Sequence, residues 1–259
     1  MNHISAIKSS VYHLIIVLLL SIGSCTDTKS DGITIATAAN VQFAMKELAA
    51  SFEKESGIAT SIIIGSSGKL TAQIKEGAPF DIFVSADMKF PNELYKSGKG
   101  VEAPRIYAHG SLILLSLRKD IKPSFSILHS DKIDHIAIAN SKTAPYGRAA
   151  EQMLKYYGEY ESLSGKLVFG ESISQTNQFI HSGAAEIAFT ARSSFIAFTA
   201  FEDKSYLAIE SESYDPIEQG VILLKRRNQN HVNARKFYLF LFSEKARDIL
   251  KKNGYEIPY

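Results

Sequence analysis

The sequence contains a single cysteine, Cys25, among its 259 residues, so no disulfide can form within the chain. The seven histidines are scattered and show neither an HxxH nor an HExxH spacing, and the sequence therefore does not predict a histidine-based metal site. A GxSxG nucleophile elbow, a Walker-type phosphate loop and a GxGxxG dinucleotide motif are also missing. These absences leave no sequence signature of a hydrolase, a nucleotide-binding protein or a dehydrogenase.

Charge and composition exclude further classes of protein. The formal net charge is +2 and the chain has no basic blocks, so nucleic acid is not expected as a partner. Apolar residues make up 45% and charged residues 22%, which is typical of a globular protein with a sizeable core. A chain of this length forms one large domain or two modest ones. No internal repeat, low-complexity stretch or long linker follows Gly32.

The N-terminal segment has the features of a targeting sequence. Lys8 precedes an apolar run over residues 11–22, which is too short to span a bilayer and fits the apolar region of a signal peptide. The letters IGSC at 22–25 resemble the lipobox of bacterial lipoproteins, where a signal peptidase cuts before the cysteine and its thiol carries the lipid. We therefore expect a lipoprotein signal peptide over 1–24, lipidation of Cys25 and a flexible tether over 25–31. A plain secretory signal with an incidental cysteine is the alternative.

The rest of the chain alternates between short apolar runs and amphipathic segments, which predicts an α/β fold built from βαβ units with largely parallel sheets. Strands are expected at 33–37, 59–64, 81–84, 111–117, 135–139, 166–169, 186–190, 206–209 and 221–224. Helices are expected at 41–52, 69–75, 88–97, 144–156, 173–181, 232–242 and 244–252.

Helix starts without acidic residues point to a site for an anion. Acidic side chains normally collect at the positive end of the helix dipole, yet none lies in the first turns that follow Asn40, Ser67 and Tyr146, and the start at Ile173 shows the same pattern more weakly because of Glu171. Asn40 is expected to be an N-cap residue. The helix at 88–97 serves as a comparison, with acids at 87 and 93. Ligands in α/β folds bind at such strand-to-helix junctions, where backbone N–H groups hold anions. Arg148 is either a cation that approaches the anion or a solvated surface residue.

Four segments of the sequence resemble the molybdate-binding proteins of bacterial ABC transporters. They read ITIATAANVQFAMKELAASFEKESG at 33–57, GSSGKLTAQIKEGAPFDIFVSAD at 65–87, APYGRAAEQML at 144–154 and FYLFLFSEKARDILKKNGYEIP at 237–258. The second segment is specific to that family, and the others are shared more loosely with proteins that bind other oxyanions. The resemblance extends from residue 33 to residue 258.

The resemblance implies a type 2 periplasmic-binding-protein fold, in which two lobes of mixed, mostly parallel sheet flanked by helices enclose the ligand. Lobe one would comprise 32–110 plus 220–259 and lobe two 111–219, with the apolar strands 111–117 and 220–224 crossing between them. The oxyanion would be bound by Asn40, Ser67, Tyr146 and, through its backbone N–H alone, Ile173. Ala39 and Ser66 are secondary candidates for oxyanion contacts.

The implied function is that of a non-enzymatic, monomeric lipoprotein of the periplasm or cell envelope. It would bind molybdate and also tungstate without a cofactor, and deliver the anion to an ABC transporter permease. The sequence departs from many family members, which have Ser at the position of Asn40, Ala at that of Tyr146 and a ligand-binding Tyr at that of Phe189. We interpret the last two differences as one exchange that moves the phenol donor.

Three alternatives remain at this point. The first is a binding protein for sulfate or another tetrahedral oxyanion. The second is an enzyme on the same two-lobed scaffold, which would need a cysteine for a covalent cofactor or acid–base residues in the cleft, whereas the only cysteine lies in the lipobox. The third is a sensory or adhesion lipoprotein that does not take part in transport.

Overall fold

The computed structural model describes residues 32–226 and 231–258. The expected signal peptide, Cys25 and the tether over 25–31 lie outside the described residues. The described residues belong to one compact unit.

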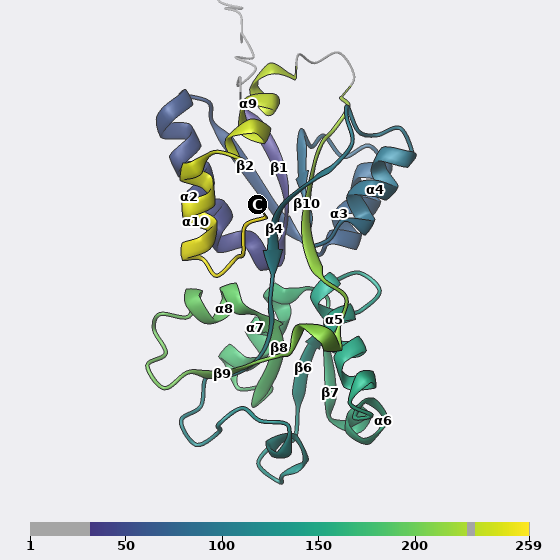
Figure 1. Cartoon of the computed structure of the whole chain (residues 1–259), viewed down its shortest axis with the longest axis vertical. Coiled ribbons are helices and arrows are strands. Elements are labelled where there is room, and N and C mark those ends of the chain that lie inside the picture. The colour runs from purple at the N-terminus through teal and green to yellow at the C-terminus, as the bar shows by residue number, and fades with distance from the viewer. Residues whose placement is uncertain (1–31, 227–230, 259) are drawn as a thin grey trace, which may run out of the picture. The chain divides into compact units, whose positions relative to one another are not determined.

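Two five-stranded sheets organise this unit (Figure 1). The first has the strand order β2-β1-β3-β10-β4, with β1 Ile33–Ala38, β2 Thr60–Gly65, β3 Ile82–Val84, β4 Arg105–Gly110 and β10 Ile217–Leu223. The second has the order β7-β6-β8-β5-β9, with β5 Leu112–Ser116, β6 Ile136–Ala139, β7 Leu167–Gly170, β8 Ile187–Ala191 and β9 Ser205–Ala208. The expected α/β architecture with two sheets is confirmed. The sheets are less parallel than expected, because each has two parallel and two antiparallel strand pairings.

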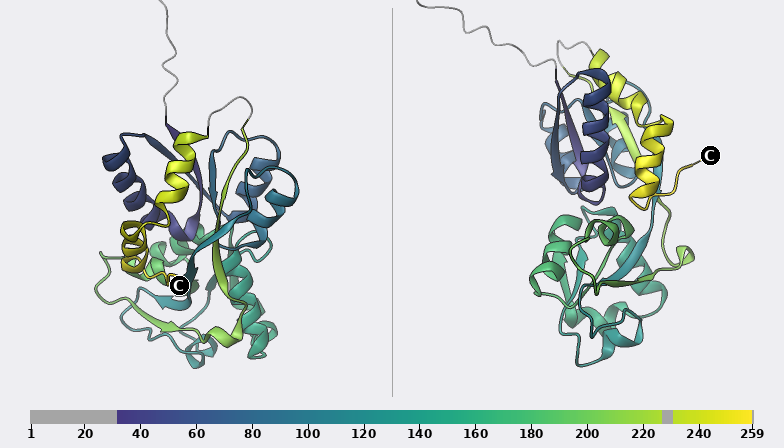
Figure 2. Two further views of the ribbon diagram at one scale, coloured as in Figure 1. Left: turned by 45° about the horizontal axis from the view of Figure 1, so that its top comes forward. Right: turned by 90° about the vertical axis from the view of Figure 1, so that its left-hand side faces the viewer.

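Helices cover both faces of each sheet (Figures 1 and 2). We call the first sheet and its helices lobe one; these are α2 Gln42–Ser56, α3 Ser67–Lys75, α4 Lys89–Lys96, α9 Val232–Phe240 and α10 Glu244–Lys252. We call the second sheet and its helices lobe two; these are α5 Pro145–Tyr156, α6 Tyr160–Leu163, α7 Ile173–Ser182 and α8 Arg192–Ala197. Short 3₁₀ turns occur at η1 Ala39–Val41, η2 Ser126–His129, η3 Ser164–Lys166 and η4 Ser211–Ser213.

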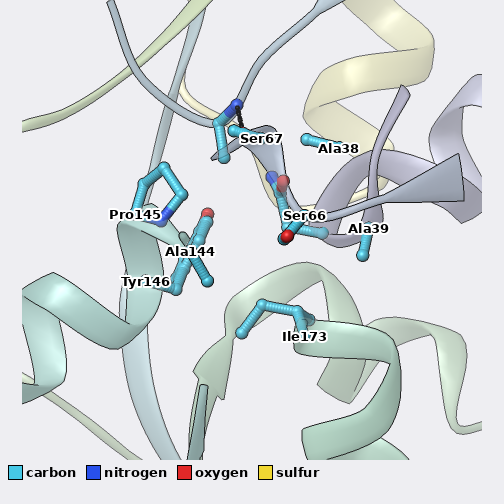
Figure 3. A pocket seen from close by; sticks show the side chains of 10 residues that line it. Ala38, Ala39, Ser66, Ser67, Ala144, Pro145, Tyr146 and Ile173 are labelled. Carbon is cyan, nitrogen blue, oxygen red and sulfur yellow. Dashed lines mark hydrogen bonds between the residues drawn. The ribbon is translucent and has the colours of Figure 1, made fainter. Parts of the chain in front are cut away.

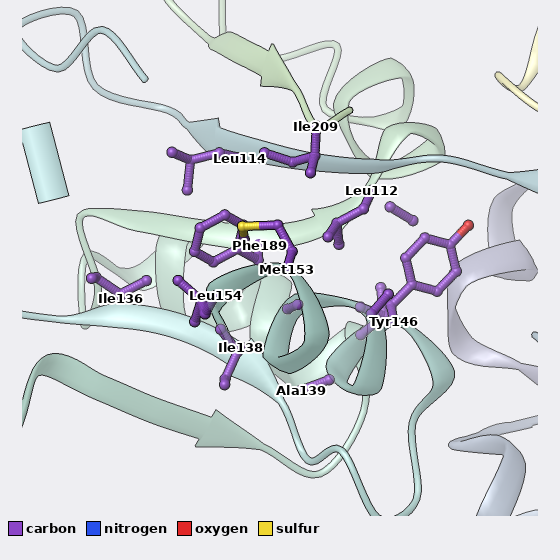
Figure 4. Packing of buried hydrophobic residues seen from close by; sticks show 14 of the residues in the cluster. Leu112, Leu114, Ile136, Ile138, Ala139, Tyr146, Met153, Leu154, Phe189 and Ile209 are labelled. Atoms are coloured by element: carbon purple, nitrogen blue, oxygen red, sulfur yellow. The ribbon is translucent and has the colours of Figure 1, made fainter. Parts of the chain in front are cut away.

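The helices on opposite faces of a sheet bury opposite sides of the same strand. On β5, Leu112 and Leu114 pack into the cluster beneath α5, where they meet Met153 and Phe189 (Figure 4). The alternate residues Ile113 and Leu115 pack into a second cluster on the other face of the sheet. Because successive side chains of a strand point to opposite faces, a strand buried on both sides must be apolar at every position.

The segments that join the two lobes differ from the predicted ones. The apolar strand expected at 111–117 lies wholly in lobe two as β5 and pairs only with β8 and β9. The chain instead passes between the lobes at Gly110, where β4 ends, and returns before Ile217, where β10 begins. Sequence analysis left β4 unassigned. The error has a physical cause, since an unbroken apolar run indicates burial on both faces and says nothing about which sheet the strand joins.

Two details of helix starts also differ from the prediction. Asn40 is not the N-cap of a helix, because it lies within η1 and α2 begins two residues later at Gln42. The comparison helix begins at Lys89, so that Asp87 precedes it and no acid lies in its first turn. Asp87 still accepts a hydrogen bond from the backbone N–H of Phe90, at 3.3 Å.

Candidate functional site

A small pocket lies where the two lobes meet (Figure 3). It is small: its space free of protein atoms is about 200 Å³, part of which is open solvent. The lining residues are Ala38, Ala39, Asn40, Ser66, Ser67, Ala86, Ala144, Pro145, Tyr146 and Ile173. All six candidate oxyanion-binding residues are therefore brought to one pocket, from segments far apart in the sequence.

Each candidate residue is positioned by a strand that runs into a helical turn. β1 leads into η1 and β2 into α3 from lobe one, while β6 precedes α5 and β7 precedes α7 in lobe two. The first N–H groups of a helix have no carbonyl partner within it, so they can bind a ligand unless another group takes them. At α3 the Gly68 N–H already donates to Thr143 O, and at α7 the Gln175 N–H donates to Ser172 Oγ. Side chains do not cap η1, α3 or α5, and only α7 is capped, by Ser172. The arrangement suits a ligand that accepts hydrogen bonds from several sides.

The lack of acids at these starts is less informative than the sequence suggested. None of the four has an acidic residue in its first turn, but α4, α8 and α9 lack one as well. What distinguishes the four starts is that they converge on one pocket, and a linear sequence does not show that.

Among the described residues that line the pocket, none carries a charge. Arg148 does not line it; its guanidinium forms an ion pair with the carboxylate of Asp87, which joins α5 of lobe two to the segment after β3 in lobe one. Lys69, at the start of α3, pairs across the lobes with Glu171 at 2.6 Å, where both side chains are more than half exposed. The nearby cations are therefore neutralised by protein carboxylates, and an anion in the pocket would depend on neutral donors.

Two adjacent serines supply hydroxyl groups to this pocket. The Oγ of Ser67 accepts the backbone N–H of Ala86 at 3.0 Å, and the hydroxyl proton of Ser67 has no acceptor among the described residues. The Oγ of Ser66 is buried and has no hydrogen-bond partner within the described part of the chain. Buried hydroxyls are nearly always hydrogen-bonded, so these two have hydrogen-bonding capacity that a ligand in the pocket could use.

Residues 33–256 match the family model described as bacterial extracellular solute-binding protein. The chain is a member of this family. Its sequence is 37% identical over 243 residues to the molybdate-binding protein ModA of Rhodobacter capsulatus, covering 92% of this chain and 93% of that protein. It is 23% identical over 257 residues to YvgL of Bacillus subtilis strain 168, named a putative ABC transporter substrate-binding lipoprotein, covering 96% of this chain and 98% of that protein.

A solved structure agrees with these sequence relatives. The periplasmic molybdate-binding protein of Azotobacter vinelandii matches this solute-binding protein with a TM-score of 0.81 at 33% identity, over 88% of this chain and 100% of that chain. The resemblance to molybdate-binding proteins is thereby confirmed over most of the chain. These relatives are named for binding a solute and not for catalysis.

The carboxamide of Asn40 is already used inside the solute-binding protein. Its Nδ2 donates to Gln219 Oε1 at 2.8 Å and to the Tyr255 hydroxyl at 3.0 Å. The orientation is fixed by a chain of contacts, because the carbonyl of Ala86 can only accept and is met by Gln219 Nε2, which turns Gln219 Oε1 toward Asn40. Both amide protons of Asn40 are therefore taken, and its Oδ1 is buried without a hydrogen-bond partner among the described residues. The donor that Asn40 could offer the pocket is thus its backbone N–H and not its side chain.

Tyr146 lies between the hydrophobic core of lobe two and Gly110, where the chain passes from one lobe to the other. Its ring is 1% exposed and packs in the cluster beneath α5, with the hydroxyl pointing out of that cluster (Figure 4). A Cβ on Gly110 would lie 2.0 Å from this hydroxyl, so the crossing must be a glycine. Burial raises the pKa of Tyr146 well above the ordinary value, and the neighbouring phenols of Tyr255 and Tyr107 raise it further.

Phe189 does not line the pocket, which weakens the proposed exchange with Tyr146. It is completely buried on β8 and packs in the same apolar cluster (Figure 4). Tyr146 lines the pocket and Phe189 does not, so the structure gives the proposed exchange no direct support.

Sequence analysis missed Gln219 and Tyr255, the two side chains that bind the Asn40 carboxamide. Gln219 follows Glu218 and precedes the apolar strand expected at 221–224, so it has the pattern of an ordinary polar strand end. Tyr255 follows the last helix, where it was interpreted only as part of a stop signal. No local feature of the sequence marks either residue.

Two other classes of site were sought over the described residues. Within 32–226 and 231–258, no group of three or more His, Cys, Asp or Glu side chains is placed to hold a metal ion. In the same ranges, no helix has the length and apolar character needed to cross a membrane.

Proposed function

We propose that this protein captures molybdate, and also tungstate, in the pocket between its lobes and delivers the anion to the permease of an ABC transporter. The proposal needs no cofactor. Asn40, Ser67, Tyr146 and Ile173 bind the oxyanion, and Ala39 and Ser66 add contacts from the same turns.

One observation supports a tetrahedral oxyanion as the ligand. Four helix starts converge on a pocket without charged lining residues, and the serine hydroxyls there keep unused hydrogen-bonding capacity. A doubly charged tetrahedral anion presents acceptors in all directions and satisfies these donors together. A cation would meet the positive ends of helix dipoles, and an apolar ligand would leave the donors unpaired. The names of the relatives favour molybdate within this class.

Location and partners follow from the family and from the N-terminal sequence. Family members are described as extracellular, which supports a place in the cell envelope. We propose that Cys25 is lipidated and that the segment after it tethers a monomeric binding unit to the membrane. The protein would thereby remain close to the transporter that accepts its ligand.

Isothermal titration calorimetry tests the ligand assignment. A soluble form without residues 1–25 is titrated with molybdate, tungstate, sulfate and phosphate. We expect tight binding of molybdate and tungstate and weaker binding of sulfate. Binding of sulfate with no response to molybdate would overturn the ligand and keep the oxyanion site, and no response to any of the four would overturn the site as well.

Two serine variants test the location of the site. Ser67→Ala removes a hydroxyl donor to a charged ligand, which is worth about 1.5–3 kcal/mol, and should weaken binding by roughly tenfold to a hundredfold. Ser66→Ala should also weaken binding. Ser51→Ala is the matched control, because Ser51 likewise has a buried hydroxyl with no partner among the described residues but lies on α2, away from the pocket. Equal affinities for the Ser66 and Ser51 variants would remove Ser66 from the site.

A further inference from the structure

Asn40 is the pocket residue with the most extensive hydrogen bonding to side chains outside the pocket. Its backbone carbonyl accepts the hydroxyl of Ser193 at 2.8 Å and the hydroxyl of Tyr255 at 2.8 Å. The two hydroxyls are also 3.2 Å apart. All three residues are buried, with 2%, 4% and 4% exposure for Asn40, Ser193 and Tyr255. These contacts lie away from solvent and directly behind the pocket.

The two hydroxyls reach Asn40 from different lobes. Tyr255 follows α10 and packs in the core of lobe one, so its contacts with Asn40 are made within one lobe. Ser193 lies on α8 of lobe two, and its hydrogen bond to Asn40 on η1 crosses from one lobe to the other. The Tyr255 contact is therefore present whether or not the lobes have met, whereas the Ser193 contact requires that they meet.

Other contacts between the lobes differ from this one in position or in exposure. The ion pair of Lys69 with Glu171 is more than half exposed, and exposed pairs contribute little. The hydroxyl of Ser174 reaches Gln42 at 3.2 Å, but neither residue lines the pocket. Ser193 alone among these three joins lobe two to a residue of the pocket through a fully buried hydrogen bond.

We propose that Ser193 is a positioning residue for ligand retention: its hydroxyl completes the hydrogen bonding of Asn40 only when the lobes close, and so slows release of the bound anion. The inference rests on the proposed function, since it concerns the same pocket. Ser193 does not touch the anion and acts through the η1 turn that carries the Asn40 N–H group. In an open protein the Ser193 hydroxyl and the Asn40 carbonyl would each bond to water, so the net contribution is that of one ordinary hydrogen bond.

The neighbouring residue provides a matched control. Ser194 is on the same helix and equally buried, but its hydroxyl bonds to Asn177 at 2.8 Å and Thr190 at 3.2 Å, both in lobe two. Ser193→Ala removes a bond between the lobes, and Ser194→Ala removes bonds within one lobe. The two substitutions delete the same atom from adjacent positions of α8.

The test measures the kinetics of molybdate binding by stopped-flow tyrosine fluorescence and the melting temperature of the ligand-free protein, on the soluble form that contains both lobes. We expect Ser193→Ala to raise koff by about three- to tenfold, to change kon by less than about twofold and to leave the ligand-free melting temperature unchanged. Ser194→Ala should lower the melting temperature and leave koff unchanged.

Two results would overturn the proposal. One is a Ser193→Ala protein with the koff of the wild type. The other is a Ser193→Ala protein that melts earlier without ligand while Ser194→Ala raises koff to the same extent, which would show a general loosening of α8. If the wild type binds sulfate and not molybdate, the same comparison is made with sulfate, because Ser193 contacts Asn40 and not the anion. A wild type that binds none of the oxyanions overturns the proposed function and this inference together.

Discussion

Gly68 lies where lobe one touches lobe two. Its substitution by alanine should weaken closure of the lobes without lowering the stability of the fold. Its backbone N–H donates to the carbonyl of Thr143 across the lobes at 2.9 Å. A Cβ at this position would lie 2.9 Å from Thr143 Cα and 3.1 Å from Thr143 O, so the backbone of the other lobe would have to move. Phe90, within lobe one, would lie 3.1 Å away through the end of its ring.

The expected effects of Gly68→Ala have opposite signs in the two states. Overpacking at a close contact costs about 1–3 kcal/mol, which corresponds to about 5- to 150-fold weaker binding if the ligand is held by closed lobes. We expect the lobes to separate in the ligand-free protein, which relieves the clash with Thr143, and Gly68 is not among the glycines with positive φ. There an alanine on a helix is stabilising by about 0.4–1 kcal/mol, reduced by the contact with Phe90. The variant should therefore bind more weakly and unfold at a higher denaturant concentration.

Calorimetric titration with molybdate and urea unfolding without ligand measure the two effects on the same preparation. Gly165→Ala is the control, because a Cβ there would meet nothing within 4 Å and the residue lies on η3, far from lobe one in the sequence and the sheet order. It should change neither affinity nor closure. A Gly68→Ala protein with wild-type affinity would refute the reasoning, since it would mean that the ligand is bound without this contact between the lobes.

Three further predictions follow from charges and from the N-terminus. Arg148→Met leaves the Asp87 carboxylate unpaired beside an anion site and should weaken molybdate binding by about tenfold or more. Asp87→Asn leaves the Arg148 cation unpaired there, so it should strengthen binding at low salt and lose this gain at high salt. Equal losses of affinity for the two variants in titrations at two salt concentrations would contradict this. Cys25→Ser should abolish labelling with palmitate, and equal labelling of variant and wild type would exclude lipidation at this residue. Burial raises the pKa of Tyr107 and Tyr146 well above the ordinary tyrosine value of about 10, so the unfolded chain releases these protons first. The free energy of unfolding should therefore fall as pH rises above about 10, by about 1.4 kcal/mol per pH unit for each group. Urea unfolding across pH 8–11 measures this decline, and a constant free energy of unfolding would contradict it.

The pocket could be located from the sequence because its parts lie at strand-to-helix junctions. Ser67 and Tyr146 each follow a predicted strand and open a predicted helix, and the ends of neighbouring strands meet at one edge of a sheet. Local sequence contains this information, since a strand, a small residue and a helix start are adjacent along the chain. The acid-free first turns are weaker evidence for an anion site than the sequence suggested, because helices elsewhere in the protein have them as well.

The hydrogen bonds that hold Asn40 in place behind the pocket could not be predicted in the same way. Asn40 is bonded to Ser193, Gln219 and Tyr255, which are 153, 179 and 215 residues away in sequence. Contacts over such separations leave no periodicity or spacing that a single sequence can reveal. The same limit explains the error over the crossing strands, because strand pairing across a sheet is a long-range property and hydrophobicity is a local one.

A pocket without charged side chains suits a transport protein, which has to release its ligand when the lobes separate. A cation in the site would bind the anion strongly in the open lobe as well, so that opening would not release it. The candidate donors come from both lobes, with Ser67 on one side and the start of α5 on the other, so separation of the lobes would remove one set of donors from the ligand. The contacts between the lobes include the neutral hydrogen bonds of Gly68 and Ser193, worth about 0.5–1.5 kcal/mol each, and the ion pairs of Arg148 with Asp87 and Lys69 with Glu171. A partner that pulls the lobes apart has to break these contacts and the ligand's bonds to one lobe, and no cation in the pocket then holds the anion back.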